Sequence, residues 1–171
     1  MMSNRPMLAF PVVRLLDIVL GRAELEIVGA LLTAVMVLGV LWAIGANPVP
    51  VDPMEATLAF IVVAAFSTGM GIAVSCVVMK LEFFATVWAV FSIVIYLLSG
   101  TIFTISYLPA ELIDILSWNP LLHATEWMRS AFFIGYPSQV LDKTYLLGWT
   151  VGSIVLGLVC ERVFRAGLLS S

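Results

Sequence analysis

The stretch ATLAFIVVAAFSTGMGIAVSCVVM, residues 56–79, runs for 24 residues without a charged side chain. A helix needs about 20 apolar residues to cross a bilayer core that is about 30 Å thick. The stretch is apolar on every face, so it lacks the alternation that marks a strand of a membrane barrel. It therefore predicts a transmembrane α-helix, whose backbone groups are all paired within the segment.

Three further charge-free runs occur in the chain. They contain 18, 28 and 17 residues and cover residues 27–44, 83–110 and 144–160. We therefore predict an all-α integral membrane protein with four transmembrane helices. These spans are expected at about residues 26–45, 56–79, 83–105 and 144–164.

The overall composition agrees with lipid as the surrounding solvent. The 171 residues are 62% hydrophobic and 11% charged, whereas soluble domains are about half apolar and a quarter charged. A net charge of −3 provides no basic field for nucleic acid. Cys76 and Cys160 lie inside apolar runs, which favours buried thiols over a disulfide.

Residues 1–24 have a different pattern. Arg14, Asp17, Gly21 and Glu24 recur at spacings of three, four and three, which places a narrow polar stripe on one helical face. This pattern predicts a cytoplasmic amphipathic helix at the membrane surface. Its role is either simple anchoring or docking of a cytoplasmic partner.

Basic residues indicate the orientation of the spans, because lysine and arginine concentrate in cytoplasmic flanks. With four spans, both termini lie on one side. That side carries Arg5, Arg14, Arg22, Lys80, Arg162 and Arg165, and the opposite side carries Arg129 and Lys143. The asymmetry predicts that both termini are cytoplasmic.

The segment before the last span is too apolar for a free loop. Ser99-Gly100 predicts a helix break, and two short helices are expected at 109–117 and 120–133. Asn119 suits the cap of the second helix and Pro120 its first turn. We expect an outer re-entrant hairpin, residues 109–135, that dips into the membrane or packs on the spans.

The second short helix carries three polar residues at spacings of three: His123, Glu126 and Arg129. Glu126 can pair with either neighbour. The cluster is either an ion pair that fixes the hairpin or a polar gate on a translocation path. A single histidine argues against a metal site, and the sequence lacks HExxH, GxSxG, GxxxxGK[ST] and GxGxxG, so we predict no catalytic residue and no cofactor.

Small residues four apart predict close helix packing. They lie on the second and last predicted spans, at Ser67, Gly71, Ser75, Gly148 and Gly152.

The stretch LSWNPLLHATEWMR, residues 116–129, resembles the hairpin before the last span in permeases of type-2 ATP-binding-cassette exporters. Ser99-Gly100, Phe103 and Leu108-Pro109 resemble the same family upstream. The most similar branch exports capsular polysaccharide, with relatives that move O-antigen and teichoic acid. Residues 4–22 resemble the cytoplasmic coupling segment of that family, which usually has six spans. The likeness implies that the first two spans are absent here.

The resemblance implies a homodimer of permease subunits in the inner membrane, docked to a separate cytoplasmic ATPase. The substrate would be a polysaccharide or lipid-linked glycan. Residues that would couple to the ATPase are Arg14, Asp17, Arg22, Lys80 and Glu82. Residues of the outer gate would be Asn119, Pro120, His123, Glu126 and Arg129. Aromatic side chains that would line the channel are Phe91, Tyr96, Phe103, Tyr107 and Trp118.

Other interpretations stay open at the level of sequence. The same scaffold in this family can carry a different substrate, such as a drug or a lipid. A truncated membrane scaffold without transport is a second possibility. A membrane-embedded enzyme that uses His123 and Glu126 is a third.

Overall fold

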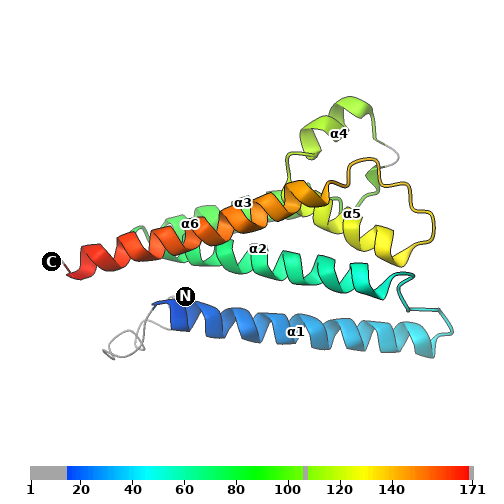
Figure 1. Cartoon of the computed structure of the whole chain (residues 1–171), viewed down its shortest axis with the longest axis horizontal. Helices are drawn as coiled ribbons and strands as arrows, with labels where there is room; N and C mark the ends of the chain where they lie inside the picture. The colour runs from blue at the N-terminus through cyan, green and yellow to red at the C-terminus, as the bar shows by residue number, and fades with distance from the viewer. Residues whose placement is uncertain (1–14, 106–107, 170–171) are drawn as a thin grey trace.

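The computed structural model describes residues 15–105 and 108–169, and this part of the chain contains helices and no strands, as predicted. The helices are α1 (Leu15–Ala43), α2 (Pro53–Lys80), α3 (Phe84–Leu97), α4 (Ala110–Leu116), α5 (Pro120–Phe132) and α6 (Lys143–Leu169). Long helices form an elongated bundle, with the start of α1 and the end of α6 at the same end (Figure 1). The short helices α4 and α5 lie at the opposite end.

Three of the described helices, α1, α2 and α6, are long and apolar enough to cross a membrane. The predicted span over residues 83–105 is shorter than expected, because α3 ends at Leu97 after 14 residues. At 1.5 Å per residue it is about 21 Å long, less than a bilayer core of about 30 Å. The chain then turns through Gly100, whose positive φ of 73° suits glycine. The count of four full spans therefore stays a prediction.

The first helix differs from expectation at its start. The sequence predicts a surface helix within residues 1–24, followed by a separate span, whereas α1 is continuous from Leu15 to Ala43. Residues 22–26, RAELE, are good helix formers, and Gly21 alone does not end a helix. The polar stripe is thus a direct extension of the span. Arg14 lies outside the described residues.

Helices α2 and α6 make the most extensive helix contact in the described structure. A Cβ atom added at Gly69 of α2 would lie 2.6 Å from the Ile154 nitrogen, and one added at Gly157 would lie 2.6 Å from the Gly69 carbonyl oxygen. The Ser153 hydroxyl donates to the Phe66 carbonyl at 3.2 Å. Close packing of small residues thus joins these helices, as expected in lipid.

The glycines that make this contact are not the ones that the sequence pattern singles out. At Gly71, Gly148 and Gly152, an added Cβ would meet nothing within 4 Å. Spacing of four identifies residues on one face, but an entirely apolar helix carries no signal for which face meets its neighbour. Small residues pack closely between these helices, as predicted. Gly71, Gly148 and Gly152 do not make this contact within the chain.

The predicted short helices are present, and their bounds agree with expectation within a residue or so. Only α5 packs against α2 and α6, and its buried residues are Leu122, His123, Ala124, Glu126, Trp127 and Ala131. No residue of α4 is buried, and Leu112 and Ile115 are 48% and 69% exposed. Packing on the spans is present for α5 and not for α4, and a dip of α4 into the membrane stays a prediction.

Replacing Gly69 by alanine is expected to destabilise the bundle, because the new methyl group meets backbone atoms of α6 that cannot move away alone. Overpacking of this kind costs about 1–3 kcal/mol. We expect a lower Tm for Gly69→Ala in detergent. Gly152→Ala is the matched control, because it adds the same atom in open space. Equal Tm values for the two variants would contradict the close contact.

Candidate functional site

The strongest concentration of buried polar groups surrounds Glu126 on α5, whose side chain is 1% exposed. Its carboxylate accepts from Arg129 Nη1 at 2.9 Å, from the Tyr136 hydroxyl at 3.0 Å and from Ser138 Oγ at 3.3 Å. Burial of a carboxylate is costly unless it is paired and hydrogen-bonded. These three donors meet that requirement. Of the two pairings that the sequence allows for Glu126, the structure contains the one with Arg129.

Arg129 also connects α5 to the turn that follows α3. Its Nη2 atom donates to the carbonyl oxygens of Gly100 and Phe103, the latter at 3.0 Å. These carbonyls follow the end of α3, where regular helix hydrogen bonds stop. The planar guanidinium holds several donors in a fixed geometry, so one side chain binds the buried acid and the interrupted backbone together.

The hydrogen-bond partners of His123 differ from those of Glu126. Its Nε2 is 2.8 Å from the Ser117 carbonyl oxygen, and its Nδ1 is 3.1 Å from the Asp142 backbone nitrogen. A backbone N–H only donates and a carbonyl only accepts, so this geometry requires the neutral tautomer with hydrogen on Nε2. The ring thereby joins the turn before α5 to the residue before α6.

The turn between α4 and α5 is held by hydrogen bonds to α3 and α6. Asn119 caps α5 by accepting from the Leu121 N–H at 3.1 Å, with Pro120 in the first turn, as predicted. Its amide nitrogen donates to the Ile95 carbonyl of α3 at 3.0 Å. The Tyr145 hydroxyl of α6 donates to the Trp118 carbonyl at 2.9 Å. The hairpin turn is therefore fixed to both α3 and α6.

A second polar contact, which the sequence analysis missed, joins α2, α5 and α6. Glu55 Oε2 accepts from Trp127 Nε1 and from Lys143 Nζ, both at 2.6 Å. The Lys143 ammonium also lies 5.0 Å from the centroid of the Trp127 ring. The distribution of basic residues gave Lys143 only a topological role. No local spacing relates residues that are 72 and 88 positions apart.

Tyr136 and Ser138 were also missed, because both lie in the irregular segment between α5 and α6. Burial, followed by the hydrogen bond to the Glu126 carboxylate, raises the pKa of Tyr136 above its ordinary value. The phenol therefore remains a donor at neutral pH. The turn signals in this segment, Gly135 and Pro137, indicate a loop but not its contact with Glu126.

Three of the predicted channel aromatics are exposed in the described structure. Phe91 and Tyr96 of α3 are 53% and 52% exposed, and Trp118 is 77% exposed. Phe103 lies in the turn bound by Arg129. Tyr107 lies outside the described residues.

The predicted coupling residues occupy one end of the bundle. Asp17 lies in the first turn of α1, Lys80 ends α2 and Glu82 lies in the turn to α3; all three are exposed. This is the end at which α6 terminates (Figure 1). Arg22 is one to two turns farther along α1, where it pairs with Glu26 at 3.9 Å.

Long apolar helices, an interrupted helix and a buried ionic cluster in a short helical hairpin define a multi-pass membrane protein. The described residues contain no group of three or more side chains suited to hold a metal ion. The chain belongs to the ABC-2 type transporter family, whose model matches residues 6–133.

Curated relatives align over nearly the whole chain. The identity is 31% over 97% of the chain with the capsule polysaccharide export inner-membrane protein CtrC of Neisseria meningitidis serogroup A. The capsule polysaccharide export inner-membrane protein BexB of Haemophilus influenzae is 27% identical over 97% of the chain. The polysialic acid transport protein KpsM of Escherichia coli is 23% identical over 99% of the chain. The chain spans 63% of the length of the first two relatives and 66% of the third.

Substituting Arg129 by glutamine is expected to release the turn after α3. Glutamine cannot bind Glu126 and two carbonyls together, and loss of one partner of a buried ion pair costs about 3–5 kcal/mol. We expect faster hydrogen–deuterium exchange over residues 98–105 and a lower Tm.

The matched control is Arg162→Gln, which removes an exposed charge near the other end of α6. It should leave exchange in the turn unchanged. Unaltered exchange over residues 98–105 in Arg129→Gln would show that the guanidinium does not hold this segment.

Proposed function

We propose that this chain is a permease subunit of an ABC exporter that moves a capsular-type polysaccharide across the inner membrane. The glycan is lipid-linked, and a separate cytoplasmic ATPase drives its movement. The observation that carries the proposal is the match to the ABC-2 family model together with alignment to three curated relatives named for capsule polysaccharide export or polysialic acid transport. The chain itself contributes the membrane path, and ATP hydrolysis belongs to the partner.

The outer hairpin serves as the gate of this path. Support comes from the discrete polar contacts that join α5 to neighbouring segments: Glu126 with Arg129, Arg129 with the turn after α3, and Asn119 with α3. Pro120 fixes the first turn of α5, and His123 fixes the approach to α6. A set of contacts in a few side chains can break and re-form as a unit, which suits a gate better than continuous apolar packing.

A homodimer places the exposed faces of two copies of α3 toward the glycan. Support comes from the exposure of Phe91 and Tyr96, because flat apolar rings let sugar rings slide past. Phe103 and Trp118 also contact the glycan in this arrangement. Membrane lipids cover the remaining apolar faces.

Coupling to the ATPase takes place at the end of the bundle that carries Asp17, Lys80 and Glu82, with Arg14 just before it in sequence. Support comes from the exposure of the three described residues and from the excess of basic residues on this side. Both termini are then cytoplasmic. Arg22, the fifth residue expected to take part, instead has its side chain in a cleft between helices.

Removing the charge of Glu126 is expected to stop export while the protein still inserts in the membrane. Glu126→Gln keeps the size of the side chain but leaves Arg129 without its buried acid. We expect surface polysaccharide to fall at least about tenfold, since one unpaired buried charge costs more than the 1.4 kcal/mol that a tenfold change represents. Glu111→Gln, on the exposed helix α4, is the control. Normal surface polysaccharide in Glu126→Gln would leave the residue with a structural role only.

Reversing the charge of Asp17 is expected to weaken binding of the ATPase. A misplaced like charge at an interface costs several kcal/mol, so Asp17→Lys should reduce copurified ATPase by about tenfold or more. Asp114→Lys makes the same change on α4, at the opposite end of the bundle. Equal ATPase recovery with both variants would remove Asp17 from the docking surface.

A further inference from the structure

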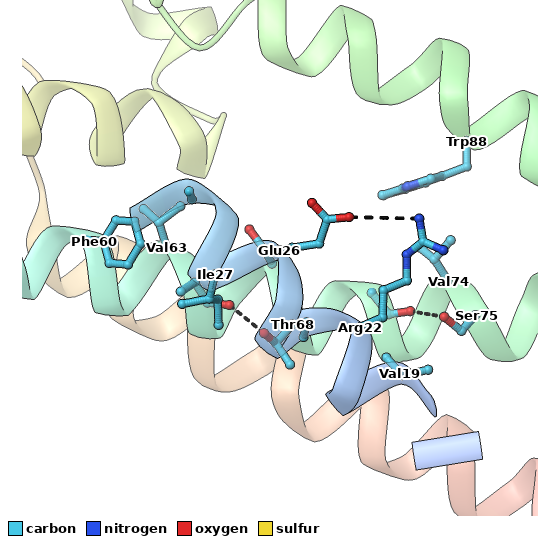
Figure 2. A pocket seen from close by; sticks show the side chains of 15 residues that line it. Val19, Arg22, Glu26, Ile27, Phe60, Val63, Thr68, Val74, Ser75 and Trp88 are labelled. Atoms are coloured by element: carbon cyan, nitrogen blue, oxygen red, sulfur yellow. Dashed lines mark hydrogen bonds and ion pairs between the residues drawn. The ribbon is translucent and has the colours of Figure 1, made fainter. Parts of the chain in front are cut away.

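A cleft of about 560 Å³ lies between α1, α2 and α3. Its two ends differ in chemistry, as Figure 2 shows. The apolar end is formed by Ala30, Phe60 and Val63, which lie away from the ends of their helices. The polar end contains Arg22 and Glu26 of α1, together with Ser75 of α2 and Trp88 of α3.

The polar end lies at the depth of lipid headgroups. The charge-free run that begins at Ile27 contains 18 residues and is about 27 Å long as a helix, close to the thickness of a bilayer core of about 30 Å. Arg22 and Glu26 come just before this run. Trp88 lies about one turn after the start of α3, where tryptophan is commonly found at membrane interfaces. The cleft therefore extends from the headgroup layer into the hydrocarbon.

The charged groups at this end form an open and balanced pair. Arg22 Nη2 and Glu26 Oε1 are 3.9 Å apart, and the two side chains are 54% and 75% exposed. An exposed pair at this distance adds little to stability. The guanidinium has five N–H donors, so most of its binding capacity is not used by one carboxylate oxygen. Figure 2 shows both side chains directed from α1 toward Trp88.

We propose that this cleft binds a zwitterionic phospholipid of the phosphoethanolamine class. Its phosphate accepts from Arg22, and its ammonium donates to Glu26. The indole face of Trp88 adds a cation–π attraction to the same ammonium. One acyl chain occupies the apolar end of the cleft. The paired opposite charges of the headgroup match the paired charges of α1, whereas a purely anionic headgroup would meet repulsion from Glu26.

A transmembrane helix of another polypeptide is the rival occupant. An apolar helix in the cleft would bury the Arg22–Glu26 pair without adding donors or acceptors, and such burial is costly in desolvation. A phospholipid supplies both opposite charges at the required depth. The observations therefore favour the lipid.

The test is native mass spectrometry of the full chain, delipidated in detergent and titrated with dioleoyl lipids. Phosphatidylethanolamine should bind about tenfold more tightly than phosphatidylglycerol. It should also bind more tightly than phosphatidylcholine, whose quaternary ammonium has no N–H to donate to Glu26. Equal binding of the three lipids, or tighter binding of phosphatidylglycerol, would overturn the proposal.

Charge variants test which side chain binds the phosphate and which binds the ammonium of the headgroup. Glu26→Gln should abolish the preference for phosphatidylethanolamine over phosphatidylglycerol, and Arg22→Gln should weaken both lipids. If Glu26→Gln kept the preference for phosphatidylethanolamine over phosphatidylglycerol, the proposal would be overturned.

A filling variant tests the location. Gly71 lines the cleft, and an added Cβ meets no protein atom within 4 Å, so Gly71→Leu fills the cleft with little strain on the fold. It should weaken phosphatidylethanolamine binding about tenfold. Gly39→Leu makes the same change on α1 outside the cleft and should bind like the parent. Equal binding by the two leucine variants would show that the lipid binds elsewhere or that a helix fills the cleft.

Discussion

The buried carboxylate of Glu126 is the constraint around which the end of the bundle that carries α4 and α5 is organised. A charge that is 1% exposed must be met by donors, and these come from Arg129 of its own helix and from the segment after it. Arg129 then has donors left over, which bind the backbone where α3 has ended. The position of the turn after α3 thus follows from the need to neutralise one acid. The same need holds Tyr136 and Ser138, and with them the segment that leads to α6.

The need to pair backbone carbonyls with hydrogen-bond donors explains why polar side chains gather in α5. An interrupted helix leaves carbonyls without donors of its own, and buried carbonyls need donors from elsewhere. His123, Arg129 and Tyr145 each donate to a main-chain carbonyl outside a regular helix, and Asn119 donates to the Ile95 carbonyl in the last turn of α3. An apolar α5 would leave the carbonyls of Ser117, Gly100 and Phe103 without these side-chain donors. The residues that look costly in the sequence are therefore the ones that make the irregular backbone stable.

Features that depend on local spacing were predictable, and those that depend on helix rotation or distant pairing were not. The cap at Asn119 and the turn at Pro120 follow from local sequence, and spacing within one helix allows Glu126 to pair with Arg129 or with His123. The contact at Gly69 was not predictable, because all faces of α2 are apolar and nothing in the pattern marks the face toward α6. Pairing of Glu55 with Lys143 joins residues that are far apart in sequence. The continuous start of α1 was missed because a polar stripe is compatible with both a surface helix and the end of a span.

Because α3 is short, its hydrogen bonds to residues of α5 determine where the chain goes after the helix ends. A helix of about 21 Å is shorter than a bilayer core of about 30 Å, and irregular backbone follows it beyond Leu97. That backbone is held by Arg129 and, through Ile95, by Asn119, both on α5. Any displacement of α5 therefore either carries the end of α3 with it or breaks these bonds. While these bonds persist, the end of α3 moves together with α5 and does not rearrange on its own.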